Sequence, residues 1–155
     1  MNTTILATIY DQLEGMAVTY LDKSNVSVTA TVYSQETMLD SIQTAHLPAR
    51  LLLPPSGSLT INPGGINLAQ WKISDLFFQE TAAQGMGTDD QIPSMTRYMI
   101  AYSAAIGKLW QIAYQTSTET RTLTAQIAAG KFEYPSQSGV WFFGVRCDLT
   151  IEELF

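Results

Sequence analysis

The side chains of this sequence that could carry out acid–base or nucleophilic chemistry are few and widely spaced. His46 is the only histidine, so neither a histidine metal cluster nor a site built from several histidines can be assembled. A Ser-His-Asp site would also need a positioned serine and acid, and the sequence lacks a Gly-x-Ser-x-Gly elbow. We therefore interpret His46, which precedes Leu47-Pro48, as an exposed loop residue.

The carboxylates do not form a recognisable catalytic pair. Glu119 with Glu133, or Asp75 with Glu80, could be combined for glycosidic chemistry, but nothing in their spacing selects either pair. No catalytic residue is predicted from these side chains.

Asp89 and Asp90 could hold a cation through their oxygens. Without a glycine-turned ligand loop, we interpret them instead as negative charge at the start of a helix that begins near Pro93. Gly64-Gly65 and Gly85-x-Gly87 are not followed by the Lys-Ser/Thr pair of a phosphate loop. We therefore expect no metal and no cofactor, and we do not expect an enzyme.

Cys147 is the only cysteine, so no disulfide can form within the chain. It falls on the apolar face of the last expected strand, and reactive thiols need an electropositive, partly exposed setting. We expect a buried structural thiol.

Composition indicates one folded domain, residues 1–155, whose surface is polar but weakly charged. The apolar fraction of 46% is enough for a full core, whereas charged residues make up only 14%, against about 25% in ordinary domains. Charged residues are depleted in the cores of interfaces, so this composition favours burial against partners. Surfaces rich in Ser and Thr are also found in other soluble proteins, so the interface remains one of two interpretations.

A net charge of −6 opposes sequence-independent binding of nucleic acid on the outer surface, which needs clustered Lys and Arg. An acidic channel through which DNA passes without sticking remains compatible with these charges. We expect neither a signal peptide nor a membrane span, because no apolar stretch approaches the roughly 20 residues that crossing a bilayer requires.

Hydrophobic periodicity and turn residues predict the elements that must position any site. In chain order they are a helix over 3–21, a strand over 26–33, a short helix over 34–44, a strand over 47–55, a small strand over 59–61, a strand over 69–79, a loop over 80–92, a helix over 93–115, and a hairpin with arms 121–133 and 140–152. This order predicts an α+β fold, with two main helices packed on one face of a mostly antiparallel sheet and a C-terminal hairpin.

The last strand has the clearest signal in the chain, because apolar residues occupy alternate positions over its length. These residues are Trp141, Phe143, Val145, Cys147, Leu149 and Ile151. We also expect this strand to lie at an edge, where it could extend the sheet into another subunit.

Two aromatic pairs each place one ring on either face of a strand. The pairs are Phe77-Phe78 and Phe142-Phe143. One ring of each should pack in the core, and the other should meet a helix, a loop or another subunit. Together with Trp141, these four rings are the residues that we expect at a core or subunit contact. Loop 80–92, with Asp89 and Asp90, is expected to contact a partner.

The element order resembles that of tail terminator and neck proteins of long-tailed bacteriophages. The resemblance rests on the first helix, the β-branched strand, the segment Leu47-Pro48-Ala49-Arg50-Leu51-Leu52-Leu53-Pro54, the helix near residue 100, and the closing hairpin with Phe143-Gly144-Val145. It implies a non-enzymatic ring of identical subunits, most often six. Such a ring caps the tail tube, stops its polymerisation and receives the filled head, so the implied partners are other copies, the tail tube protein, a head-completion or neck protein, and DNA in the lumen. The implied location is the virion tail or neck, assembled in the host cytoplasm.

Two alternatives stay open. A neighbouring neck or tail-completion protein would share nearly all these features. A small α+β enzyme or ligand-binding domain, with a pocket lined by Tyr98, Tyr102 and Trp110, is the other.

Overall fold

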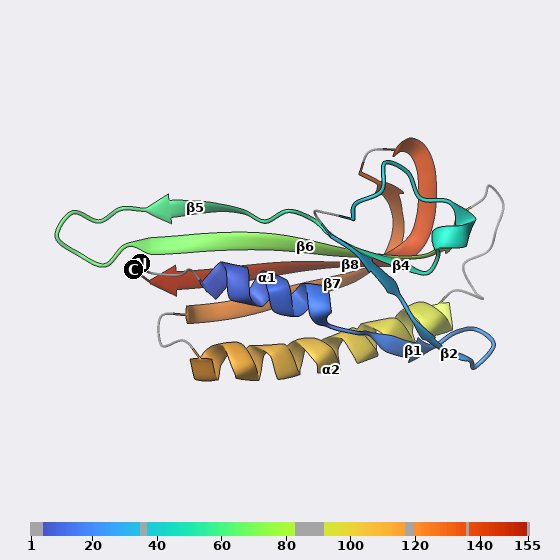
Figure 1. The fold of residues 1–155 in the computed structure, drawn as a ribbon, viewed down its shortest axis with the longest axis horizontal. Helices are drawn as coiled ribbons and strands as arrows, with labels where there is room; N and C mark the ends of the chain where they lie inside the picture. Colours follow the sequence, from blue (N-terminus) through green and yellow to red (C-terminus); the bar gives the residue numbers. More distant parts are fainter. Residues whose placement is uncertain (1–4, 35–36, 83–91, 117–119, 136, 155) are drawn as a thin grey trace.

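The computed structural model describes residues 5–34, 37–82, 92–116, 120–135 and 137–154. Within these ranges the chain is an α+β fold, drawn in Figure 1. Its elements are α1 (Ile5–Gly15), β1 (Thr19–Leu21), β2 (Ser27–Thr29), β3 (Thr31–Tyr33), the 3-10 helix η1 (Thr44–His46), β4 (Ala49–Leu52), β5 (Ser56–Thr60), β6 (Leu68–Thr81), α2 (Ile92–Thr116), β7 (Thr120–Tyr134) and β8 (Gln137–Leu154).

Six of the described strands form one mostly antiparallel sheet. Its order is β3-β4-β6-β8-β7, and β5 pairs with the same side of β6 as β4 does, nearer the start of β6. Only β3 and β4 pair in parallel, while β1 and β2 form a small antiparallel sheet of their own. The predicted fold class and the C-terminal hairpin are confirmed.

The last strand, β8, lies in the middle of this sheet. It pairs with β6 on one side and with β7 on the other, so the expectation that it forms an edge is wrong. The reason is that the chain returns after α2 to add β7 outside β8. The described edges are β7 on one side and β3 with β5 on the other.

One face of the sheet, here called the helix face, carries α1 and α2. Alternate residues of β8, from Phe143 to Ile151, are buried there and confirm the predicted period-2 pattern. They pack with Phe77 of β6 and with Tyr98 of α2, whose rings are stacked with centroids 3.7 Å apart and planes 7° apart. This cluster is the larger of two hydrophobic cores.

The opposite face, here called the outer face, is covered over only part of its area. Residues 37–48 lie over Phe78, Phe142 and Tyr134 and form the second core with them. The Tyr134 hydroxyl donates a hydrogen bond to the Leu39 carbonyl, which ties this segment to the hairpin. The remainder of the outer face is polar, with Lys72 on β6 and Arg146 and Asp148 on β8.

The first helix ends at Gly15, so it is shorter than the predicted helix, which ended at residue 21. Apolar residues continue past Gly15 because Val18 and Tyr20 are buried in the extended segment that follows, where residues two apart lie on the same side. A spacing that fits both periods cannot separate a helix from the strand β1 that follows it.

The expected strand 26–33 is divided at Ala30, because β2 pairs with β1 whereas β3 pairs with β4. Among residues 37–43 there is no helix, so the predicted helix over 34–44 is wrong there, although Ile42 is buried as expected. The strand predicted over 47–55 is confirmed as β4, whose four residues are buried on both faces.

The stability of the fold is expected to fall in alkaline solution. Burial raises the pKa of Cys147 to about 12, and burial also raises the pKa values of Tyr98 and Tyr102. The pKa in the unfolded chain is 9.0 for the thiol and 10.0 for the phenols. The stability contributed by a raised pKa is complete below the pKa of the unfolded chain and is lost as the pH rises toward the pKa of the folded chain. Urea midpoints should therefore decrease from pH 8 to pH 11. A midpoint that stays constant over this range would contradict the burial of these groups.

Candidate subunit interface

Four of the aromatic residues predicted to make a core or subunit contact lie inside the chain. Phe77 and Phe143 are buried on the helix face, and Phe78 and Phe142 are buried under residues 37–48. The prediction that each pair divides between the two faces is correct. Of the neighbours expected for the outward rings, which were a helix, a loop or another subunit, the structure shows a segment of the chain itself, 37–48.

Trp141 is the exception, with 45% of its side chain exposed. Trp141 pairs with Glu133 of β7. It lies beyond the register shift between Phe78 and Glu80 in the β6–β8 pairing, outside the row of buried alternate residues of β8. Asp89, Asp90 and most of the predicted loop 80–92 lie outside the described residues.

A buried polar network fixes both helices to the sheet. Arg50 on β4 forms an ion pair with Asp75 on β6, with 2.7 Å between Nη2 and Oδ2, and neither side chain is exposed by more than 1%. The Arg50 guanidinium also donates to the carbonyl oxygens of Leu13 and Met16 at the C-terminal end of α1. The Tyr102 hydroxyl of α2 donates to Asp75 at 2.7 Å. Arg50 therefore satisfies carbonyl groups that a helix end leaves unpaired.

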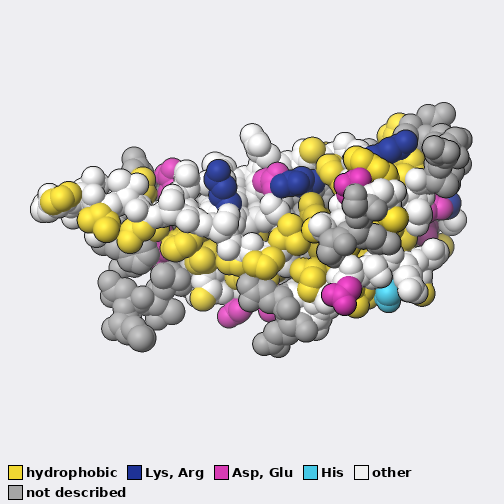
Figure 2. Space-filling view, turned by 90° about the horizontal axis from the view of Figure 1, so that it is seen from above, with side chains coloured by type: hydrophobic (Ala, Val, Ile, Leu, Met, Phe, Trp, Pro, Cys, Tyr) yellow, Lys and Arg dark blue, Asp and Glu magenta, His cyan; other side chains and the backbone are white. Residues whose placement is uncertain are grey.

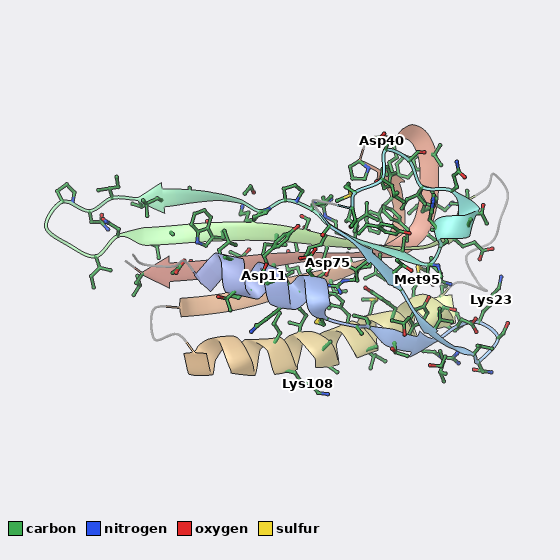
Figure 3. All side chains as sticks on the ribbon, in the orientation of Figure 1. Asp11, Lys23, Asp40, Asp75, Met95 and Lys108 are labelled. Carbon is green, nitrogen blue, oxygen red and sulfur yellow. The ribbon has the colours of Figure 1, made fainter. Side chains whose placement is uncertain are left out.

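This network joins β4 and β6 to both helices. Burial alone would lower the pKa of Arg50, but the charge and hydrogen bonds of Asp75 raise it above its ordinary value. Every donor and acceptor of the pair is aimed at a neighbouring element rather than at a cavity. Figure 3 shows Asp75 between the sheet and α1.

An arm, residues 56–68, projects from one end of the sheet. It consists of β5, a turn and the start of β6, and in Figure 1 its turn reaches beyond the end of β8. Leu59, Ile61 and Ile66 are 52%, 68% and 62% exposed there. Hydrophobic side chains line this narrow end of the molecule in Figure 2.

The arm's turn is held in one conformation by its own hydrogen bonds. The backbone carbonyl of Asn62 accepts a hydrogen bond from the Gly65 N–H. The backbone N–H of Asn62 donates to the Asn67 side chain, and its side-chain amide donates to the Ile66 carbonyl. All three bonds are between 2.9 and 3.0 Å long. Gly64 has φ +77°, a left-handed conformation that favours glycine. Polar groups are thus used within the turn, while Ile61 and Ile66 face outward.

A groove of about 710 Å³ lies between the end of α1 and the middle of α2. Its walls are mainly apolar, with Met16, Ala17 and Val18 on one side and Ala101, Ala104 and Ala105 on the other. Lys108, which points away from the sheet in Figure 3, is its only charged lining residue. The Oε1 atom of Gln12, another lining residue, is buried without a hydrogen-bond partner in the described part of the chain.

The pocket suggested by the ligand-binding alternative is not formed. Tyr98 and Tyr102 are buried in the core, 1% exposed, and pack against each other and against Phe77 rather than lining a cavity. Small residues of α2 line the groove instead. The side chain of Trp110 lies outside the described residues.

His46 is half-buried rather than fully exposed. Its Nδ1 accepts a hydrogen bond from the Gln43 N–H, and its ring packs edge-on against Tyr33. Among the described residues, no group of three or more His, Cys, Asp or Glu side chains could hold a metal ion. In the same part of the chain, no helix combines the length and the apolar character needed to cross a membrane.

Comparisons with known proteins return no match, either among protein-family models or among curated proteins.

Sequence reasoning identified residues 56–65 only as turns and a small strand, and missed the arm as a surface. One signal was available, because no side chain from Leu51 to Trp71 is charged. An exposed strand and turn without charge lacks the usual protection against association.

Proposed function

We propose that this chain is a tail terminator of a long-tailed bacteriophage, whose copies form a ring of six that caps the tail tube. Such a ring acts by shape: it stops addition of further tube subunits and offers a surface to the neck of the filled head. The element order that resembles these proteins supports the proposal, as does the α+β arrangement with two helices on one sheet face. The net charge of −6 agrees with a lumen through which DNA moves without being held.

One observation carries the proposal, namely the uncharged arm with three exposed large apolar side chains. Soluble monomers rarely expose contiguous apolar patches beyond a few hundred Å² without using them. The turn of the arm extends past the end of β8, where its apolar side chains are available to a second molecule. A subunit that must be completed by a neighbour is what a ring requires.

The native mass of the purified chain, alone and with a tail tube protein, tests this function. We expect a closed oligomer of the 17.1-kDa chain, six copies in the simplest case, and its retention on the ends of tube assemblies. Tails of uncontrolled length should form when the gene is deleted. A monomer under both conditions would refute the proposal, whereas a ring that binds neck proteins but not tube ends would favour the neighbouring neck protein.

The groove gives the ligand-binding alternative its one specific observation, because its volume lies within the roughly 300–1,000 Å³ usual for small-molecule sites. A monomer whose melting temperature rises with a small apolar compound would favour that alternative.

A further inference from the structure

We propose that the arm of one copy of this chain packs into the groove between α1 and α2 of the next copy. This inference rests on the proposed function, because it specifies the contact by which the ring closes. It joins two different surfaces of the chain, the arm and the groove.

The polarity of the two surfaces matches. The arm presents Leu59, Ile61 and Ile66 and contains no charged residue. The groove is walled by alanines and by Met16 and Val18. Removing apolar surface from water is favourable in proportion to the area buried, so three large aliphatic side chains can contribute substantially to association.

Charge also favours this pairing over contacts elsewhere. Two copies that each carry −6 repel each other, so the contact should use surfaces that lack negative charge. The arm is neutral, and Lys108, the one charged side chain among the described residues that line the groove, has the opposite sign to the chain.

The arm cannot reach the groove of its own chain. In Figure 1 the turn of the arm lies at the far end of the sheet, whereas the groove lies between the end of α1 and the middle of α2. The occupant is therefore a second copy. A contact between two different surfaces is heterologous, and repeated contacts of this kind generate a ring when the rotation closes.

The arm is also pre-organised for such a contact. The internal hydrogen bonds of Asn62 and the positive φ of Gly64 hold the turn in one shape. A partner therefore binds a turn that already has its conformation, which reduces the entropy lost on association.

Two variants separate the two halves of the contact. Ile61→Lys places a charge on the arm and leaves the groove intact, and Ala104→Trp fills the groove and leaves the arm intact. Ile100→Lys is the matched control, because Ile100 is 66% exposed, close to the 68% of Ile61, but lines neither surface. Circular dichroism and melting temperature verify that each variant is folded.

Native mass spectrometry of the full chain gives the decisive result. We expect the wild type and Ile100→Lys to form rings, and each of the other two variants to lose the ring. An equimolar mixture of Ile61→Lys and Ala104→Trp should give heterodimers without rings, because one intact arm and one intact groove remain available to them.

Each of the other outcomes contradicts one part of the proposed contact. Rings formed by Ile61→Lys exclude the arm, and rings formed by Ala104→Trp exclude the groove. Two ringless variants that do not form heterodimers with each other exclude the pairing of these two surfaces. In all three cases the wild-type ring, and with it the proposed function, stands. A wild type that is monomeric with and without tail tube protein removes both proposals.

Discussion

Replacement of Arg50 by alanine is expected to lower the free energy of unfolding by about 3–5 kcal/mol. The substitution leaves the Asp75 carboxylate buried without its cation, with only the Tyr102 hydroxyl among the bonds described above. It also removes the donors to the Leu13 and Met16 carbonyls, so the end of α1 loses two hydrogen bonds to β4. Equilibrium urea unfolding followed by tryptophan fluorescence measures the change.

The matched control is Arg146→Ala on the outer face. Arg146 and Asp148 also form an ion pair, at 3.0 Å, but both side chains are nearly half exposed. Exposed pairs contribute about 0–1 kcal/mol, so this variant should remain close to the wild type. Equal losses for the two variants would contradict the structural role of the Arg50–Asp75 pair.

A double replacement separates the charge from the packing. Arg50→Met with Asp75→Leu removes both buried charges together, and such exchanges are often neutral or stabilising. We expect this double variant to unfold at higher urea concentration than Arg50→Ala.

Replacement of Gly144 by alanine should be the second large effect. A Cβ atom on Gly144 would lie 1.9 Å from the backbone oxygen of Phe77 and 3.0 Å from its carbonyl carbon. The obstacle is backbone of the paired strand β6, which cannot move aside as a flexible side chain can. We expect a loss of about 1–3 kcal/mol or more, the range of overpacked cores, seen as a lower urea midpoint.

Gly130→Ala is the matched control, because Gly130 lies directly opposite Gly144 in the β7–β8 pairing. The nearest atom to its added Cβ would be on the Phe132 ring at 3.8 Å, an ordinary contact. This variant should match the wild type within about 0.5 kcal/mol, as changes away from special features do. If both glycine variants lose the same stability, the close approach of β6 and β8 is not the cause.

The sequence was sufficient to predict those elements in which the apolar residues repeat at one period, either that of a helix or that of a strand. The long helix α2 and the hairpin β7–β8 lie within a few residues of their predicted ranges, because α2 and β8 each bury a periodic row of apolar residues. The helix predicted over 34–44 was wrong over residues 37–43, because Met38, Leu39 and Ile42 have the spacing of a helix face but cover the outer face from an irregular segment. Its shape is set by the Phe78 and Phe142 surface that it covers, which is distant in sequence.

Strand neighbours were beyond sequence reasoning for a related reason. The alternation of β8 shows which residues face inward but not which strands lie on either side, so an edge and a central position give the same pattern. The neighbours of the outward aromatic rings were left open for the same reason. Phe78 and Phe142 were correctly expected to face away from Phe77 and Phe143, but only the fold reveals that residues 37–48 cover them.

The continuity of β6 has a mechanical consequence for the arm. One unbroken strand pairs with β4 in the core and with β5 at the base of the arm, and β8 runs beside it throughout. The arm is therefore expected to be stiff rather than flexible, and its direction follows the twist accumulated along β6. In the proposed ring, a copy bound at the arm would be held at an orientation to the helices that is set by the twist of β6.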